Sequence, residues 1–510
     1  MPFLNLPSAV RMHYEVLSLS TSTTSHSIHA TAAWLDPSRP TLVVLVPFFV
    51  THASALCQLG PTSPLLRSHN VLAFSPRAHG RTTSEPKAHD AFASAADLAF
   101  AFEALQLPPS QLYAPGSICG RIALAFAAMF PSQVTALALC GVGSGARLAG
   151  PEAWATLEST LFNPPEEQDL HEVVGELALQ SLGYNADTDS IDELTNIFVR
   201  RYNPRHAVSA YTLCRLVYLS MPLTAEAAAL IKAPVLLLHG EDDVFCPPSD
   251  PARWTQVLVN AEAVEMHVIP GAPHVCYHTH NDDVLPRLTS FLSRHAPSSS
   301  PSPIPLDLTA ALRTCSSITG NPKVLLRNSR CPESYSVLPD AEREEATRDL
   351  ARMQQYEAEW AKRPLVRGAE GLEPWEAAKT ERVARPTWRW SRRHEFPSAS
   401  PRSSSRFSCA NEVIVQIDSV RRTSRADEAV ALPLSTVDKV LSPRLGRTAS
   451  ATSSFRNYDG ESSDDESDGE SCRGRKDSGY GEFDDFDMAK QDGVVESMSR
   501  LALQQAYASS

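Results

Sequence analysis

The stretch YAPGSICGRIALAF, residues 113–126, sets the architecture of this chain. It begins as a short apolar run, turns sharply at Gly116-Ser117, and continues as an Ala-rich segment with apolar residues at helical spacing. This pattern predicts a buried strand, a tight turn and a buried helix. A serine in such a turn stands at the positive end of the following helix, where the next backbone N–H can bind an oxyanion. Ser117 is therefore a candidate nucleophile, and the amide of Ile118 is a candidate oxyanion donor.

Similar apolar runs lie on both sides of this stretch and alternate with helical segments. The predicted strands are 41–46, 71–74, 111–114, 134–141, 234–239 and 265–269, and the main predicted helices are 92–105, 118–130, 253–260 and 283–294. Strands that alternate with helices favour a parallel sheet covered on both faces. Residues 12–34 are expected to form an antiparallel hairpin at one edge of that sheet.

Two later segments supply partners for the serine. HGEDDVFCPP (239–248) and PGAPHVCYH (270–278) each follow a predicted strand, and they contain Asp243 and His274. The carboxyl ends of parallel strands share one edge of a sheet, so these residues can meet Ser117 in the chain order Ser, Asp, His. Alternatives remain open. Glu241 or Asp242 can replace the acid, and His278 or His280 can replace the histidine. Cys119 is a further nucleophile candidate, although a buried hydrophobic role suits it better.

Composition divides the chain near residue 296. Residues 1–296 carry 16 Lys+Arg and 26 Asp+Glu, whereas the last 214 residues carry 30 and 33. The first part can bury a large core, and the second is too polar to do so. The predicted organisation is a core, 1–150, a helical cap, 151–230, the rest of the core, 231–296, and a disordered tail with short helices, 297–510. One exposed helix is expected at residues 341–362.

The combined motifs resemble the α/β-hydrolase superfamily, in its capped esterase, lipase and enol-lactonase-like branch, over about residues 12–296. The segment SPRAHGRT (75–82) is similar to the Asp-x-Arg-Gly-His-Gly-x-Ser loop of that superfamily, with Ser75 and Ala78 as departures. The Gly-x-Ser-x-Gly elbow also departs, because Pro115 and Cys119 stand at its two glycine positions. The resemblance implies a second oxyanion donor just past the first long strand, which here is the amide of Phe49. We expect His79 and Arg77 to brace their loop by hydrogen bonds.

These features predict a serine hydrolase that cleaves a carboxylic ester, lactone or thioester of a small apolar acyl group. Two alternatives stay open: a catalytically inactive scaffold that binds protein partners through the tail, and an acyltransferase. The ten cysteines are scattered and no metal-ligand spacing occurs, so we expect no cofactor, no metal and a cytoplasmic location. The net charge of −13 disfavours nucleic-acid binding, and no apolar run of about 18 residues predicts a membrane span.

Overall fold

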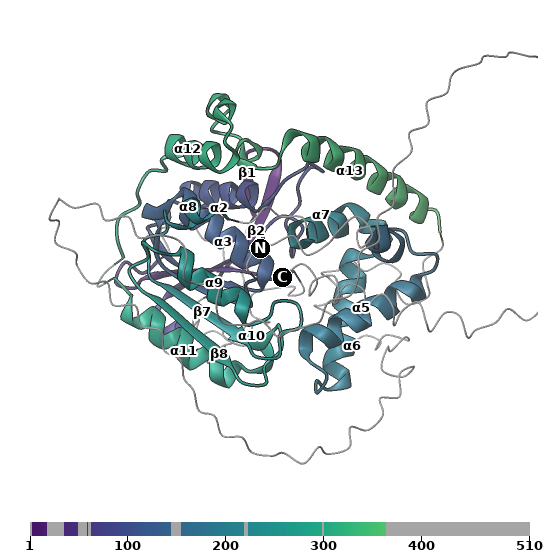
Figure 1. The fold of residues 1–510 in the computed structure, drawn as a ribbon, viewed down its shortest axis with the longest axis horizontal. Coiled ribbons are helices and arrows are strands. Elements are labelled where there is room, and N and C mark those ends of the chain that lie inside the picture. Colours follow the sequence, from purple (N-terminus) through teal and green to yellow (C-terminus); the bar gives the residue numbers. More distant parts are fainter. Residues whose placement is uncertain are drawn as a thin grey trace, which may run out of the picture. The chain divides into compact units, whose positions relative to one another are not determined.

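The computed structural model describes residues 3–17, 35–48, 59, 63–143, 155–218, 223–297 and 300–363. Within these residues the central element is one mixed sheet of eight strands, in the order β1-β2-β4-β3-β5-β6-β7-β8 (Figure 1). The strands are β1 (Phe3–Leu6), β2 (Val10–Leu17), β3 (Thr41–Leu45), β4 (Asn70–Phe74), β5 (Ser110–Pro115), β6 (Val134–Cys140), β7 (Val235–Gly240) and β8 (Val264–Ile269). From β4 to β8 neighbouring strands are parallel, because helices connect them.

The antiparallel edge differs from the expected hairpin. It is formed by β1 and β2, with Leu6 opposite Val10 at the tight turn, and β2 then pairs antiparallel with β4. The hairpin therefore begins near residue 3, and the second arm expected up to residue 34 lies outside the described residues. β1 was missed because the turn residues Ser8 and Ala9 both have positive φ, a backbone conformation that their side chains do not signal.

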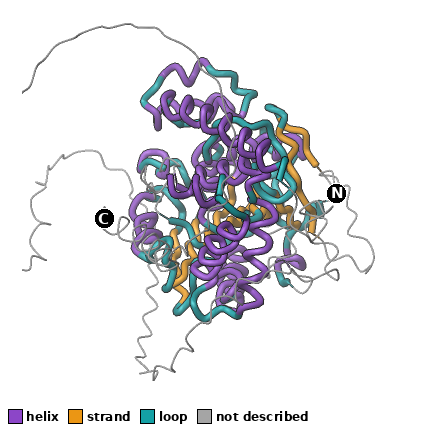
Figure 2. The backbone as a smooth tube through the Cα atoms, turned by 90° about the vertical axis from the view of Figure 1, so that its right-hand side faces the viewer, coloured by secondary structure: helices purple, strands orange, loops and turns teal. Residues whose placement is uncertain are grey.

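Helices cover both faces of the sheet, with the strands between them (Figure 2). On one face lie α2 (Ala91–Leu105), α3 (Ser117–Met129) and α9 (Ser249–Val257), and on the other lie α1 (Leu65–Ser68) and α11 (Asn281–Arg294). β3 is buried along its whole length, as expected for a parallel strand with helices on both sides. The predicted α/β class is confirmed. Because the helices cover the two faces of the sheet, the loops at the carboxyl ends of the strands are available to form a site.

The segment between β6 and β7 is helical, as predicted for the cap. It contains η5 (Glu158–Phe162), α5 (Glu167–Leu182), α6 (Thr188–Tyr202), η6 (Pro204–His206), α7 (Ala207–Tyr218) and α8 (Ala225–Ala228). Two of these helices begin at a residue whose side chain caps the first turn. The Asp187 side chain accepts from the N–H of Ser190 at the start of α6, and the Thr224 hydroxyl accepts from the N–H of Ala227 at the start of α8. The glycine-rich stretch before this insertion, residues 144–150, lies outside the described residues.

Residues 300–363, which composition assigns to the tail, pack against the core instead. They form α12 (Leu308–Thr319), η7 (Pro322–Leu326), η8 (Pro332–Tyr335) and α13 (Asp340–Trp360). The predicted helix at 341–362 is present as α13, which lies beside α7 (Figure 1). It is not an exposed helix, because its residues Ala346, Leu350 and Met353 are buried. A narrow apolar stripe packs this helix against the core, although most of its other residues are charged. The average composition of the segment does not reveal such a stripe. The rest of the predicted tail, 364–510, lies outside the described residues.

Buried polar contacts at Arg77 and Asp90 are among those that tie this C-terminal segment to the core. Glu333 of η8 forms an ion pair of 2.9 Å with Arg77, whose guanidinium is fully buried and also binds Asp97 through two hydrogen bonds. The carboxylate of Asp90 caps α2 with one oxygen and accepts from the N–H of Val337 with the other. Among the described helices, none has the length and apolar character needed to cross a membrane.

Candidate active site

The predicted elbow forms where β5 enters α3. Gly116 has φ of 82°, a left-handed value that glycine adopts at little cost, and α3 begins at the next residue. Four residues later, a Cβ on Gly120 would lie 2.8 Å from Cγ2 of Val142, so this glycine allows α3 to pack closely beside the end of β6. A Cβ on Gly116 would meet no atom closer than 3.6 Å, so Gly116 contributes its backbone conformation to the elbow and Gly120 contributes the close packing.

Ser117 lies in the predicted cavity, but its hydroxyl does not meet the predicted base. The Ser117 Oγ atom is buried and has no hydrogen bond to His274. Among the described residues no group forms a hydrogen bond with this hydroxyl. Cys246, three residues beyond Asp243, lines the same cavity. The positive φ of the turn belongs to Gly116 and not to the serine. Rotation about the Cα–Cβ bond of Ser117 is therefore needed to bring its hydroxyl to the imidazole.

Asp243 and His274 are joined directly. Asp243 Oδ2 lies 2.8 Å from His274 Nδ1, and Asp243 Oδ1 accepts from the backbone N–H groups of Phe245 and Cys246, at 2.9 Å each. The two loops meet because a Cβ on Gly240 would lie 2.3 Å from the carbonyl oxygen of Ala272, an approach that only glycine permits.

The charges of this pair stabilise each other. Burial opposes ionisation of Asp243, but the nearby imidazoles of His274 and His239 outweigh it and lower the pKa of the carboxyl. Burial also opposes protonation of His274, and the Asp243 carboxylate outweighs that effect and raises the pKa of the imidazole. The pair thus has the polarity that a general base and its orienting acid require.

The alternative acids and histidines are placed elsewhere. Glu241 accepts from the N–H of Gly271, and so holds the histidine loop rather than the imidazole. His278 is exposed, and His280 bonds its neighbour Thr279. Burial raises the pKa of the Cys119 thiol well above its usual range, which keeps it neutral and unreactive.

Three further residues belong to the site: His239 and Cys246, to which sequence reasoning gave no role, and His79, which it expected only to brace its loop. His239 is fully buried and lies 3.4 Å from Asp243 Oδ2, while its Nε2 donates to the carbonyl oxygen of Cys246 at 2.6 Å. Ligand atoms of Cys246, Asp243 and His274 lie within 4.8 Å of one another, a grouping that can hold a metal ion, although Asp243 and His274 already satisfy each other. The third residue, His79, lines the cavity. Two of these residues had a signal in the sequence: His239 is the polar residue that ends the apolar run 234–239, and His79 lies in the polar loop 75–82.

Of the two predicted oxyanion donors, one lies within the described residues. Ile118 is the second residue of α3, and its N–H lies at the open amino end of the helix. Phe49, the second predicted donor, lies outside the described residues. Pro47 and Phe48, just before it, line the cavity.

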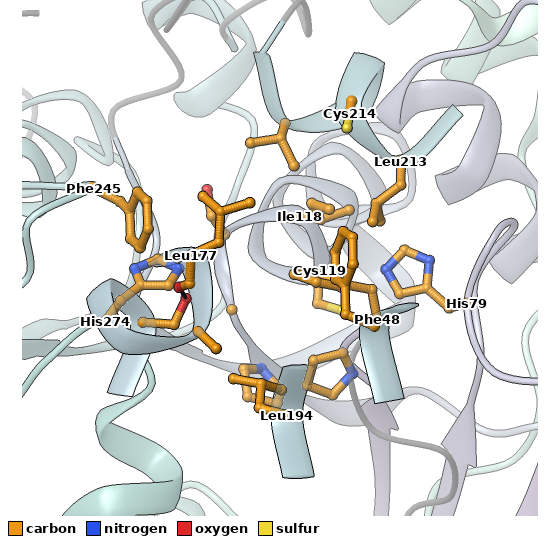
Figure 3. A pocket seen from close by; sticks show the side chains of 18 of the residues that line it. Phe48, His79, Ile118, Cys119, Leu177, Leu194, Leu213, Cys214, Phe245 and His274 are labelled. Atoms are coloured by element: carbon orange, nitrogen blue, oxygen red, sulfur yellow. Dashed lines mark hydrogen bonds between the residues drawn. The ribbon is translucent and has the colours of Figure 1, made fainter. Parts of the chain in front are cut away.

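A cavity of about 130 Å³ connects these groups. Phe245 and His274 lie on one side of it, and Phe48 and His79 lie on the opposite side (Figure 3). The cap closes the cavity with apolar side chains, namely Leu161, Val174, Leu177, Ala178, Leu194, Phe198, Leu213, Cys214 and Val217. Of the cap aromatics, Phe198 reaches the cavity, while Tyr202 is buried beside it with its hydroxyl on the carbonyl oxygen of Ala78.

Comparison with known proteins gives one family match and several similar structures. Residues 203–299, which include Asp243 and His274 but not Ser117, match the prolyl oligopeptidase family. None of the curated proteins matches the chain in sequence. The chain is similar to the structure of Est816, described as an N-acyl homoserine lactone degrading enzyme, at 18% identity over 57% of this chain and 100% of that one, with a TM-score of 0.44.

Two further similar structures have comparable values. One is the enol-lactonase from Burkholderia xenovorans, at 17% identity over 57% of this chain and 100% of that one, with a TM-score of 0.44. The other is an esterase from Exiguobacterium antarcticum, at 15% identity over 57% of this chain and 98% of that one, with a TM-score of 0.45.

Proposed function

We propose that this chain is a serine hydrolase of the α/β-hydrolase kind, acting on a carboxylic ester, lactone or thioester. The order of its strands and the match of residues 203–299 to the prolyl oligopeptidase family support the proposal. One observation carries the proposal: His274, which is hydrogen-bonded to Asp243, lines an apolar cavity that Ser117 also lines. Acid, histidine and serine follow three parallel strands, in the chain order that this fold uses. The apolar lining favours a small apolar acyl group.

The proposed reaction begins when the Ser117 hydroxyl, which has no hydrogen bond among the described residues, turns toward His274. The oxygen attacks the acyl carbon and its proton passes to His274 Nε2, while Asp243 stabilises the imidazolium that forms. The amides of Ile118 and Phe49 bind the oxyanion. The bond from the acyl carbon to the leaving oxygen or sulfur then breaks as His274 returns the proton to it. Water, deprotonated by His274, releases the acid and restores the serine.

An alkyl fluorophosphonate probe tests this proposal because it labels only an activated serine. We expect labelling of the wild-type chain and none of Ser117→Ala. Ser159→Ala is the matched control, since that exposed cap serine bonds only the carbonyl oxygen of Thr156 one turn earlier. Labelling should persist in this control. A wild-type chain that is folded and stays unlabelled would overturn the proposal, and so would labelling that survives in Ser117→Ala.

The second candidate function is a non-catalytic scaffold. The missing Ser117–His274 hydrogen bond and the positive φ at Gly116 favour it, because an active elbow presents its serine to the base. Protein partners bound through residues 364–510 belong to this candidate. An unlabelled chain whose cavity still binds small molecules would support the scaffold over the hydrolase. Acyl transfer and a cytoplasmic location stay predictions.

A further inference from the structure

His79 lies in the cavity wall opposite His274, and its side chain is fully buried (Figure 3). The reaction proposed above gives it no role. Two labelled neighbours, Phe48 and Leu213, are apolar, and the edge of the His79 ring meets the ring of Phe48 at a centroid distance of 6.3 Å. An imidazole in such surroundings requires a partner for each nitrogen, because a buried polar atom without one costs free energy.

One nitrogen of His79 has its partner, and that partner fixes where the proton is. Nδ1 lies 2.7 Å from the carbonyl oxygen of Arg77. A carbonyl oxygen only accepts, so Nδ1 carries the hydrogen and donates it. Burial, assisted by the cation of Arg201, lowers the pKa of His79 to about 4, so the ring is neutral near pH 7. Nε2 therefore presents a lone pair and no hydrogen.

That lone pair is unpartnered and the loop holds it in place. Among the described residues, no group donates a hydrogen bond to His79 Nε2. The loop cannot easily turn the ring away, because Arg77 is anchored by Asp97 and Glu333, and the hydroxyl of Tyr202 donates to the carbonyl oxygen of Ala78 at 2.7 Å. The cavity thus offers one fixed, neutral acceptor in an otherwise apolar wall.

We propose that the cavity binds ligands that carry a neutral hydrogen-bond donor, a hydroxyl or an amide N–H, at the end that faces His79, where Nε2 accepts it. This inference rests on the proposed function only where it identifies the ligand as the substrate. Binding at His79 does not require the reaction to take place. The same lone pair repels a carboxylate or phosphate, and the apolar lining disfavours an ammonium group. His79 is then a specificity-determining residue that selects hydroxylated or amide-bearing acyl compounds over plain ones.

Binding of small probes to the Ser117→Ala chain tests the inference without turnover. The probes are the linear alcohols from butanol to octanol, the N-methyl alkanamides of matching length, and the methyl ethers of the same alcohols, measured by calorimetry. Alcohols and amides can donate to Nε2 and ethers cannot. We expect the best donor to bind about tenfold more tightly than its ether, the value of one net hydrogen bond in an apolar site. The two donor series distinguish hydroxyl from amide recognition.

Two variants assign the selectivity to His79. In His79→Asn the side-chain amide nitrogen takes the place of Nδ1 and keeps the bond to Arg77, while the Nε2 acceptor is lost. We expect donor and ether to bind equally in this variant. Leu213→Ala is the matched control, because it enlarges the same wall and leaves the acceptor, so the tenfold ratio should persist. Equal binding of donor and ether by the Ser117→Ala chain, or selectivity that survives in His79→Asn, would overturn the inference.

A spectroscopic measurement covers the case in which His79→Asn fails to fold. In the otherwise native chain labelled with ¹⁵N-histidine, the resonance of the unprotonated His79 Nε2 should move when an alcohol binds and stay in place when its ether binds. An unmoved resonance at a saturating alcohol concentration contradicts the proposal. Donor-selective binding without probe labelling of Ser117 would overturn the hydrolase proposal and support this inference. Labelling of Ser117 without donor-selective binding would support the hydrolase proposal and overturn this inference.

Discussion

The acid–histidine half of the candidate site and its serine half are built differently. In the loops after β7 and β8, Asp243 accepts three hydrogen bonds, and the close approach at Gly240 locks the two loops together. At the turn from β5 into α3, the left-handed residue is Gly116, and the hydroxyl of the serine that follows has no hydrogen bond to the base. One half of the site is therefore held by backbone packing, while the other half depends on the orientation of a single side chain.

The largest effect is expected from breaking the ordered half. Asp243→Asn keeps the shape and removes the charge, so His274 loses its fixed tautomer, and we expect kcat/KM to fall by about 10³–10⁴. The pH profile gives a second measurement. Because Asp243 raises the pKa of His274, wild-type activity should be lost as the pH falls through a midpoint above 6.5. In the variant, burial alone remains and that midpoint should fall below 6.5.

The carboxamide variant would contradict this assignment if it kept both the wild-type rate and the wild-type midpoint. Glu241→Gln is its matched control, because Glu241 lies two residues away and bonds only the backbone of the histidine loop. We expect the control to keep the wild-type midpoint, since it changes no charge that contacts the imidazole.

A smaller effect is expected from loosening the loop that carries His79. Glu333→Gln removes the charge that pairs with buried Arg77, and we expect the free energy of unfolding to drop by about 1–3 kcal/mol. Burial opposes ionisation of Glu333, but Arg77 outweighs it and lowers the pKa to about 2 from the ordinary 4.5. Its contribution is therefore present above pH 4.5 and lost as the pH falls toward 2. Urea unfolding at pH 7 and pH 3 measures both effects.

Glu103→Gln provides the comparison for that variant. Glu103 pairs with Arg330 at the surface, where both side chains are exposed, so its removal should cost less than about 0.5 kcal/mol. Equal losses in the two variants would mean that the contact between η8 and Arg77 contributes no more than a surface pair.

The smallest effect sharpens the serine half. Cys246→Ala shortens a side chain that lines the same cavity as Ser117 and gives the serine hydroxyl more room to turn toward His274. We expect fluorophosphonate labelling to become about threefold faster, which corresponds to about 0.6 kcal/mol. Cys214→Ala removes another cavity cysteine, on α7, and should not produce this increase. Slower labelling in Cys246→Ala would show that the thiol supports the serine rather than diverting it.

Much of this architecture could be predicted because its causes are local. The runs 41–46 and 234–239 are buried on both faces, which requires continuous apolar residues, and the observed strands agree with them to within a residue. The pairing of Asp243 with His274 could be predicted because each follows a strand at the same sheet edge, while their catalytic roles stay predictions. The C-terminal boundary was misplaced because α13 is fixed by a few apolar residues within a charged helix. Such a stripe acquires meaning only when α7 is placed beside it.

Hydrophobic period and strand order are enough to predict the alternating sheet, the helical insertion after β6 and the residues available at the carboxyl edge. Which acid binds His274, where the Ser117 hydroxyl points and what His79 faces follow from the packing of the folded chain. Those outcomes depend on distances of a few ångströms between segments far apart in the chain. A hydrogen bond is lost when its donor and acceptor move apart by about 1 Å, and residue patterns do not specify distances between segments so finely.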